Sequence, residues 1–476
     1  MNRIAGDGAG QYSRVYRGYF LTLMVVVSAF AIIDRVALLT VGQAISRDLG
    51  LNDFQFGLVS GFAFAVVYTL AGLPLARIAE SGNRVKLISI AVAVWSVFSF
   101  LSGFALNFLQ LLLCRVVIGI GEAGVQPPAI AIISDLYPPN RRGTALAILS
   151  IGLPLGSLIG AASAGYLADA YSWRTVFLLL GVPGLVLAVI AWATLRDPPR
   201  GLSEGMSSAA LEPAPPARAV FRHLAARASF WHIVVGLALT YFAAAGIGSF
   251  IPQYFARVFA MSLGQSGILF GLVGASSSLA GNLSGGVIVD WISRRDQRWY
   301  VWLPATGILI AAPLYLGAFG VLNPMIATGL LVVAGVFMFL HYAPSQAVLQ
   351  NMVEPRMRAT AAFIFFFIVS MLGYGVGPTL LGLISDALAR HAFSPGNYHS
   401  MCSGAAPIAG IAPELVKACH SASASGIRGA MTIMSCLFFW AALHFWLAAR
   451  TLRHDLRLDS STLPGALANG KLNSLN

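Results

Sequence analysis

Four charged residues fall inside long apolar runs of the sequence: Asp34, Arg35, Arg115 and Glu122. A charge at the centre of a membrane helix costs at least about 2.5 to 3.5 kcal/mol, so such residues are usually functional. Burial disfavours a charged carboxylate, whereas a neighbouring arginine favours it, so a buried acid beside an arginine can take up and release a proton. We therefore expect Asp34 and Glu122 to carry protons. Arg35 would exchange between the two carboxylates, and Arg115 would also offer a fork-shaped donor to an anionic group.

The spacing of these residues places them near one another. Arg115 and Glu122 lie two helical turns apart and so share a helix face. At a rise of about 1.5 Å per residue, Asp34 and Arg115 lie at a similar depth, and Glu122 lies about 10 Å deeper. The alternative is purely structural: an ion pair such as Asp34 with Arg115 would hold two helices together. Two adjacent pairs exceed what that role needs, which favours the functional interpretation.

The composition identifies the elements that must position these charges. The chain of 476 residues is 57% hydrophobic and 10% charged, whereas soluble domains are roughly 45–50% apolar and 25% charged. Its apolar runs have about the length that crosses a hydrocarbon layer of roughly 30 Å. The sequence therefore predicts an all-α membrane protein with twelve transmembrane helices. We place them at 17–43, 55–76, 87–106, 108–133, 144–168, 174–195, 230–256, 265–289, 299–319, 325–349, 359–385 and 429–449.

Two longer connections divide the chain. We expect an N-terminal six-helix bundle over residues 1–195 and a cytoplasmic linker over 196–229, which contains several prolines. A C-terminal six-helix bundle follows over 230–450 and includes a long periplasmic loop over 386–428. The remaining residues, 451–476, form a cytoplasmic tail.

The formal charge of +12 is concentrated in alternate loops, which fits the positive-inside rule with both termini in the cytoplasm. We therefore expect the basic residues to face the lipid bilayer and not a nucleic acid. We also expect the protein to be a monomer. The first apolar run follows Arg14 and Arg17 and lacks a cleavage site, so we do not expect a cleaved signal peptide. Short loops without a glycosylation sequon favour a bacterial inner membrane, with a eukaryotic organellar membrane as the alternative.

The chain has four cysteines. Cys402 and Cys419 fall in the predicted periplasmic loop, where an oxidising environment favours a disulfide over two free thiols. Cys114 and Cys436 fall within spans, where a cysteine is usually a small buried hydrophobe.

The two predicted bundles repeat each other's sequence. A group in the first half recurs 210 residues later: Ala76, Glu80 and Arg84 match Gly286, Asp290 and Arg294. A second group recurs 217 residues later: Gly156, Gly160, Gly165 and Asp169 match Gly373, Gly377, Gly382 and Asp386. Arg142 similarly matches Arg358. Such matches predict two halves inserted in the same orientation, as in many transporters.

With these features the sequence resembles the major facilitator superfamily over essentially the whole chain. The stretch from Gly286 to Arg295 is similar to the signature of its loop between spans eight and nine. Residues 80–86 resemble the copy between spans two and three, although Ala76 replaces the usual glycine and Glu80 replaces aspartate. Asp34-Arg35, Glu122 and the stretch 137–145 most resemble the Spinster branch. The resemblance implies two pseudo-symmetric six-helix bundles, with spans one, four, seven and ten lining a central cavity.

The repeated charges at the cytoplasmic helix ends could lock the two bundles together in one state. A carboxylate followed one turn later by arginine can pair and dock on a neighbouring helix end. The residues expected in this latch are Glu80, Arg84, Arg142, Asp290, Arg294 and Arg358. The alternative is an ordinary basic cytoplasmic loop.

The polarity of the expected cavity suggests an amphipathic substrate. The charges of the first half suit a polar headgroup, including Arg115 as a contact. The wall of the second half would be mainly apolar and aromatic, with Tyr241, Phe242, Ile247, Phe250, Phe337, Met338 and Tyr342. His341 is either a headgroup contact or a hydrogen-bonded packing residue.

These features predict a secondary transporter, not an enzyme, that works by alternating access on the proton gradient and needs no cofactor or metal. Resemblance to the Spinster branch implies a lipid-like substrate, because animal members export sphingosine-1-phosphate or lysophospholipids. A transporter of small organic anions or sugar phosphates is the alternative within this class. A membrane sensor that does not transport is the alternative from another class.

Overall fold

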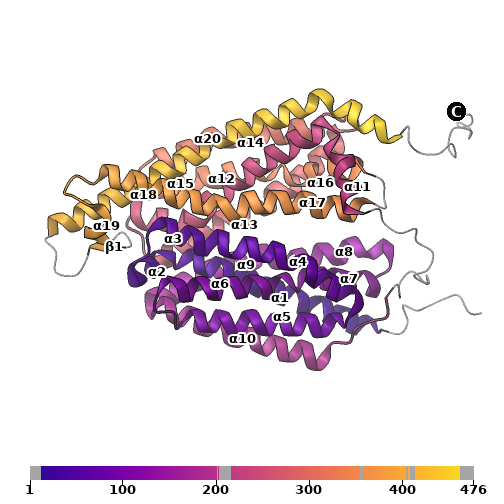
Figure 1. The fold of residues 1–476 in the computed structure, drawn as a ribbon, viewed down its shortest axis with the longest axis horizontal. Coiled ribbons are helices and arrows are strands. Elements are labelled where there is room, and N and C mark those ends of the chain that lie inside the picture. Colours follow the sequence, from indigo (N-terminus) through magenta and orange to yellow (C-terminus); the bar gives the residue numbers. More distant parts are fainter. Residues whose placement is uncertain are drawn as a thin grey trace, which may run out of the picture.

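The computed structural model of the chain describes residues 12–200, 202, 216–353, 357–403, 406–407 and 413–460. Over this part the chain contains 12 helical segments that are long and apolar enough to cross a membrane. Figure 1 shows the helices running along the long axis in two layers, with α1 to α10 in one and α11 to α20 in the other. The predicted all-α membrane fold is therefore confirmed.

The layer formed by residues 12–200 is called the N-terminal half. Its helices are α1 (Arg14–Thr40), α2 (Gly42–Leu49), α3 (Asp53–Gly57), the π-helical η2 (Leu58–Phe62), α4 (Ala63–Ser81), α5 (Arg84–Ser102), α6 (Phe108–Ala123), α7 (Gln126–Leu136), α8 (Pro139–Ser150), α9 (Gly152–Ala170) and α10 (Trp173–Thr194). Polar residues begin several of them: the side chains of Asn52, Asn83, Asn107 and Ser172 each accept a hydrogen bond from a backbone N–H of the first turn. Such caps satisfy N–H groups that have no partner within the helix.

The layer formed by residues 216–460 is called the C-terminal half. Its elements are α11 (Ala217–Ala225), α12 (Ala228–Val258), α13 (Leu263–Ile292), α14 (Trp299–Gly320), α15 (Pro324–Phe339), α16 (Tyr342–Asn351), α17 (Arg358–Ser370), the π-helical η5 (Met371–Val376), α18 (Gly377–Ala392), α19 (Tyr398–Met401), the two-residue strands β1 (Cys402–Ser403) and β2 (Ala406–Pro407), and α20 (Pro413–Ser460). The short α11 lies within the predicted linker and buries Val220 and Leu224.

The stretch 386–428, which we predicted as a periplasmic loop, is helical over much of its length. The helix α18 continues to Ala392, and α20 begins at Pro413 and runs without interruption for 48 residues. Residues 413–428 are too polar to read as a membrane span, but their alanines favour a helix. The first part of the predicted tail is also helical, because α20 continues as far as Ser460.

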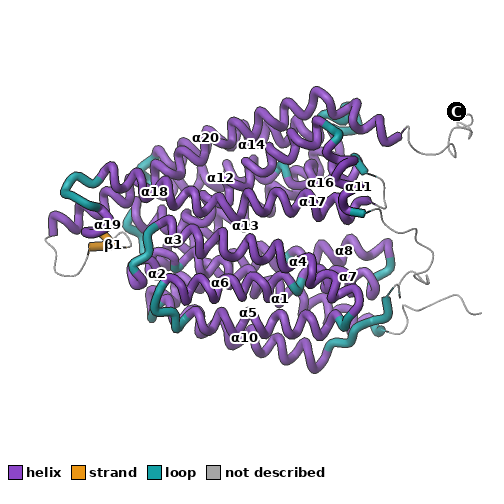
Figure 2. The backbone as a smooth tube through the Cα atoms, in the orientation of Figure 1, coloured by secondary structure: helices purple, strands orange, loops and turns teal. Residues whose placement is uncertain are grey.

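Cys402 and Cys419 form a disulfide with a Cα–Cα distance of 5.7 Å. We call this end of the molecule, where α2, α3, α18 and α19 lie, the disulfide end; Figure 2 shows loops gathered here and at the opposite end. The opposite end, where α1 begins and α20 ends, is called the terminus end. Cys114 is buried, but Cys436 is exposed on α20, so the expectation that it is buried is wrong.

The two halves approach each other closely at one matched pair of the repeated glycines, Gly165 and Gly382. A Cβ atom on Gly165 of α9 would come within 2.3 Å of the backbone oxygen of Leu263 on α13. A Cβ atom on Gly382 of α18 would come within 2.1 Å of the backbone oxygen of Asp53 on α3. Only glycine fits so close a backbone approach, which explains why this pair of matching positions is glycine in both copies of the repeat.

Candidate functional site

Arg35 of α1 and Glu122 of α6 form an ion pair inside the N-terminal half. The Arg35 Nε lies 2.6 Å from the Glu122 Oε2, and the terminal nitrogen Nη2 contacts the same oxygen. The Glu122 side chain is 1% exposed and that of Arg35 is 34% exposed. The other carboxylate oxygen, Oε1, is buried without a hydrogen-bond partner among the described residues. Arg35 is therefore the accessible member of the pair, and the Glu122 Oε1 can accept a further hydrogen bond.

Asp34 and Arg115 form a second, more deeply buried pair between the same two helices. The Arg115 Nη1 lies 2.8 Å from the Asp34 Oδ2, and the two side chains are 2% and 4% exposed. The hydroxyl of Ser99 on α5 donates to the other carboxylate oxygen of Asp34. This is the contact considered in the structural alternative, and it holds α1, α5 and α6 together.

Phe64 lies between the two arginines. The guanidinium carbon of Arg35 is 4.4 Å from the centre of its ring, and that of Arg115 is 5.4 Å away. Arg35 also lies 5.1 Å from the ring of Tyr68, one turn further along α4. Rings at these distances attract a guanidinium through cation–π contacts. The sequence analysis missed Phe64, Tyr68 and Ser99, because apolar or weakly polar residues within spans carry no charge signal.

A cavity of about 160 Å³ opens beside the accessible pair. Arg35, Tyr68, Trp95, Glu122 and Gln126 line it, and all its lining residues belong to the N-terminal half. Asp34 and Arg115 are not among the lining residues. The four predicted charges are thus brought together, but only the Arg35–Glu122 pair meets the cavity.

The predicted residues of the second half divide into two groups. Met338, Ile247 and Phe250 belong to the hydrophobic core of the C-terminal half, with exposures of 5%, 2% and 0%, rather than to a cavity wall. Phe242 and Phe337 are partly buried against that core. None of the five lines the cavity beside Arg35 in this conformation, so their role as a substrate wall stays a prediction.

The remaining predicted residues surround His341. Tyr241 meets the His341 ring edge to face at 5.4 Å between ring centres, and it lies equally far from the ring of Tyr374. His341 is 1% exposed and its Nδ1 lies 2.5 Å from the Met338 carbonyl oxygen, so in the present arrangement it is a hydrogen-bonded packing residue. Tyr342 is 45% exposed. The sequence analysis missed Tyr374, which the π-helical η5 presents and which is 46% exposed.

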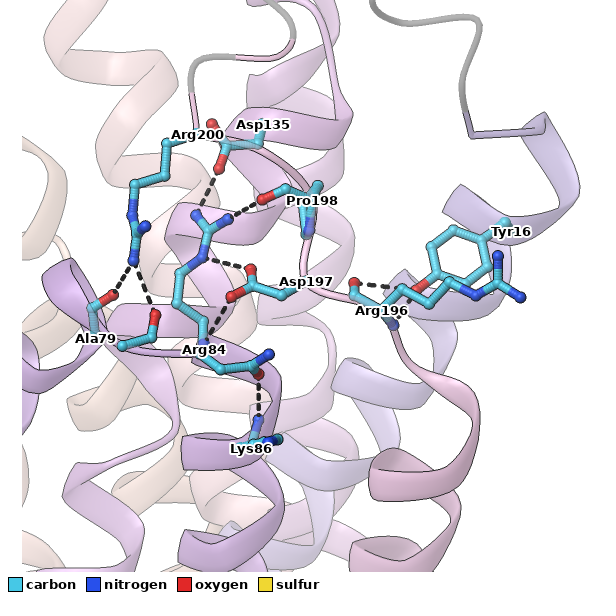
Figure 3. A network of polar contacts seen from close by, with 11 residues as sticks. Tyr16, Ala79, Arg84, Lys86, Asp135, Arg196, Asp197, Pro198 and Arg200 are labelled. Carbon is cyan, nitrogen blue, oxygen red and sulfur yellow. Dashed lines mark hydrogen bonds and ion pairs between the residues drawn. The ribbon is translucent and has the colours of Figure 1, made fainter.

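Arg84, one of the expected latch residues, is bound within its own half (Figure 3). Its guanidinium contacts Asp135 at the end of α7, lies 2.8 Å from Asp197 and 2.6 Å from the carbonyl oxygen of Pro198. Its partners are thus neither the exposed Glu80 nor a residue of the opposite half. Arg142 donates to the carbonyl oxygens of Ser134 and Tyr137 and so fixes the turn between α7 and α8.

The matching residues of the C-terminal half, Asp290 and Arg294, are exposed and form no ion pair with another described side chain. The side chain of Arg358 lies outside the described residues. Asp296, two residues after Arg294 in the same loop, is instead the partner of Arg298 and Arg453. Burial alone would raise the pKa of Asp296, but hydrogen bonds from these two arginines outweigh it and lower that pKa to about 2.

A buried polar network joins the halves at the disulfide end. Arg257 of α12 donates to both carboxylate oxygens of Asp53 on α3, at 2.8 and 2.7 Å. It also donates to Gln43 of α2 and to Gln253 of α12. The Ser385 hydroxyl of α18 donates to Asp53 at 2.6 Å. These residues lie at or beyond the ends of the predicted spans, where a charge is ordinary, so the sequence analysis did not select them.

Comparison with known proteins agrees with the fold. The family model of the Major Facilitator Superfamily matches residues 23–378. The crystal structure of a bacterial homologue of the human lysosomal transporter Spinster, in an inward-facing and unoccupied conformation, is 32% identical. It superimposes with a TM-score of 0.84, over 93% of this chain and 99% of the other.

Two sequence relatives are also transporters. A major-facilitator-type efflux pump of Mycolicibacterium smegmatis is 31% identical, over 77% of this chain and 84% of the relative. The hexuronate transporter of Bacillus subtilis is 25% identical, over 74% of this chain and 84% of the relative. The chain therefore belongs to the major facilitator superfamily, as a multi-pass membrane transporter of the Spinster type.

Proposed function

We propose that this protein moves an anionic, amphipathic, lipid-like substrate across the membrane together with protons, by alternating access. The Arg35–Glu122 pair carries this proposal, because it lines the cavity and its arginine is 34% exposed while its carboxylate is 1% exposed. A substrate anion can therefore reach Arg35 without first unpacking the helices. Glu122 can respond only by changing its partner or its protonation.

The proposed coupling follows from competition for Arg35. When an anionic headgroup takes the guanidinium, Glu122 is left buried without its charge partner. Leaving one member of a buried ion pair unpaired costs about 3–5 kcal/mol, so the Glu122 carboxylate takes up a proton and becomes a neutral acid. Substrate and proton are then bound together and move in the same direction.

Asp34 would take part as the second carboxylate within reach of the arginines. Arg115 and Ser99 hold Asp34 in the deeply buried Asp34–Arg115 pair, so we expect Asp34 to exchange partners only when the helices move. Arg35 neighbours Asp34 on α1 and can approach it when a protonated Glu122 releases the guanidinium. In that step Asp34 would become the alternative proton carrier.

The aromatic side chains of the second half support an amphipathic substrate. Tyr342 and Tyr374 are 45% and 46% exposed, and Tyr241 lies beside Tyr374. Together they offer apolar ring surface with few charges, facing a half that supplies the guanidinium of Arg35. The similarity to a homologue of the lysosomal transporter Spinster supports the same class.

A small hydroxylated anion is the second candidate substrate. The same three tyrosines carry hydroxyl groups that could bind sugar hydroxyls, and the hexuronate transporter of Bacillus subtilis is a relative. Counterflow of labelled lysophospholipid, sphingoid phosphate, hexuronate and hexose phosphate in proteoliposomes separates the candidates. Flux of either lipid supports the proposal, flux of only the sugar acids or phosphates favours the second candidate, and no flux favours a sensor.

The coupling role is tested separately with Glu122→Gln in the same proteoliposomes. The substituted amide keeps the size of the side chain but cannot gain or lose a proton. We expect substrate exchange without a gradient to persist and accumulation driven by a pH gradient to disappear. Unchanged dependence of flux on the gradient would remove Glu122 from the coupling mechanism.

For the location we propose a bacterial inner membrane with both termini in the cytoplasm. The concentration of lysine and arginine in loops of the terminus end and the disulfide at the opposite end support this orientation. Single cysteines introduced at Arg14 and near Tyr398, in a background without Cys114 and Cys436, test it. A membrane-impermeant thiol reagent applied to whole cells should label only the second position.

A further inference from the structure

A second cavity, of about 380 Å³, lies at the terminus end of the N-terminal half. It opens where α5 begins and α10 ends, and Asn83, Lys86, Trp192, Arg196 and Asp197 contribute to its lining. None of these residues lines the transport cavity beside Arg35. The second cavity is therefore a separate site.

The charges around this cavity leave it positive. Lys86 and Arg196 are exposed and form no ion pair with a described side chain. Asp197 is the one acidic lining residue, and its carboxylate is held by Arg84, whose Nε lies 2.8 Å from it. Because Arg84 neutralises Asp197, the two free cations set the charge that a ligand meets.

The walls of the cavity are fixed by hydrogen bonds, as Figure 3 shows. The backbone N–H of Arg196 donates to the Tyr16 hydroxyl at 2.7 Å. The N–H of Arg84 donates to Asp197 at 2.9 Å, and that of Lys86 donates to the Asn83 side chain at 2.8 Å. A site whose backbone is already ordered loses less entropy when it binds a ligand.

The position of the cavity matches the edge of a membrane. One candidate span begins at Arg84 and another ends at Thr194. Trp192 is 55% exposed, as is usual for the aromatic residues that lie at the level of lipid headgroups. The ammonium group of Lys86 lies 6.0 Å from its ring, so the lysine extends along the surface toward that level.

Exposed apolar side chains lead away from the cavity toward the middle of the same helices. Ile90, one turn after Lys86, is 53% exposed, and Val189, one turn before Trp192, is 67% exposed. The surface thus presents cations and a tryptophan at one level and apolar side chains below them. This order matches a phospholipid, with its headgroup above its acyl chains.

We propose that this cavity binds the phosphate headgroup of an anionic phospholipid, with Lys86 and Arg196 as the charged contacts and Trp192 beside the glycerol region. The acyl chains would lie against α5 and α10. The site is independent of the transported substrate, because it is on the outer face of one half and shares no lining residue with the transport cavity.

The experiment measures lipid binding to the full-length protein in detergent by native mass spectrometry, with phosphatidylglycerol and phosphatidylcholine as probes. Each basic residue near a headgroup contributes about fivefold in affinity. We expect Lys86→Gln and Arg196→Gln each to weaken phosphatidylglycerol binding by about that factor, and the double variant to weaken it further. Binding of phosphatidylcholine should change little. Unaltered melting temperatures without lipid establish that the variants are folded.

The matched control removes two exposed charges at the same end but outside the cavity, in Arg14→Gln/Arg450→Gln. An equal loss of phosphatidylglycerol in this control would mean general attraction to a basic surface and would overturn the proposal. Equal affinity of the wild-type protein for both lipids would overturn it too. Displacement of the lipid by millimolar inorganic phosphate would indicate a site for free phosphate instead.

Discussion

Asp169 and Asp386 occupy matching positions in the two halves, and each caps the first turn of a helix in the opposite half. Asp169 of α9 accepts hydrogen bonds from the N–H groups of Leu263 and Gly264 on α13, at 3.1 and 2.8 Å. Asp386 of α18 accepts them from residues 53 and 54 on α3, at 3.1 and 2.9 Å. The capped N–H groups have no partner within their own helices. The repeat in the sequence thus becomes a pair of equivalent contacts that close the disulfide end.

Removing either cap should loosen the disulfide end. An N-terminal cap contributes about 0.5–2 kcal/mol, so Asp386→Ala should shift the balance between the halves toward opening at that end. Asp169→Ala should have a smaller effect, because Asp169 is exposed whereas Asp386 is buried beside the Arg257–Asp53 network. Distances between spin labels on α3 and α18 report the opening. Equal distance distributions in both variants and the wild type would contradict the prediction.

At the closed disulfide end, the loss of one member of the Arg257–Asp53 pair should destabilise the protein more than the replacement of both members. Breaking a buried pair by removing one partner costs about 3–5 kcal/mol, whereas replacing both partners can be nearly neutral. We expect Arg257→Met to lower the melting temperature in detergent more than the double change Arg257→Met/Asp53→Leu does. If adding Asp53→Leu to Arg257→Met lowered the melting temperature further, as an independent second loss would, this account would be ruled out.

Arg35 and Arg115 should respond differently to the same conservative change. Lysine keeps the charge but loses the planar fork of arginine. Because Arg35 lines the cavity, Arg35→Lys should raise the KM for substrate with little change in melting temperature. Because Arg115 is 2% exposed and holds Asp34, Arg115→Lys should lower the melting temperature. Each variant serves as the control for the other. A raised KM in Arg115→Lys together with a lowered melting temperature in Arg35→Lys would place the accessible site at Arg115.

The sequence was sufficient for the fold and the buried charges, for physical reasons that also mark its limits. A charge within a span is costly, so Asp34, Arg35, Arg115 and Glu122 were recognisable one by one. That they lie near one another followed from depth and helix periodicity. Which carboxylate takes which arginine, and that only Arg35 meets the cavity, depends on helix rotation and packing.

Contacts at the ends of helices were harder to predict. Arg257 and Asp53 lie where a charged residue is normally solvated, and nothing in the sequence distinguishes a buried end from an exposed one. The repeated Asp169 and Asp386 were recognised as a repeat, but their partners are backbone N–H groups, which every residue except proline carries. Residues 413–428 were read as a loop because hydropathy reports burial in lipid and not helix formation.

Arg84 and Arg294 match in the repeat but not in their surroundings, so their loss should have different consequences. Arg84 is 3% exposed and binds two carboxylates and a carbonyl oxygen, whereas Arg294 is exposed. Arg84→Gln removes the guanidinium that the half-buried Asp135 and Asp197 share and should lower the melting temperature clearly, while Arg294→Gln, the matched control, should leave it nearly unchanged. If both arginines instead act as an interbundle latch in the opposite conformation, both variants should change transport rate alike. Measuring stability and rate on the two proteins therefore separates a fixed structural role for Arg84 from the latch expected from the sequence.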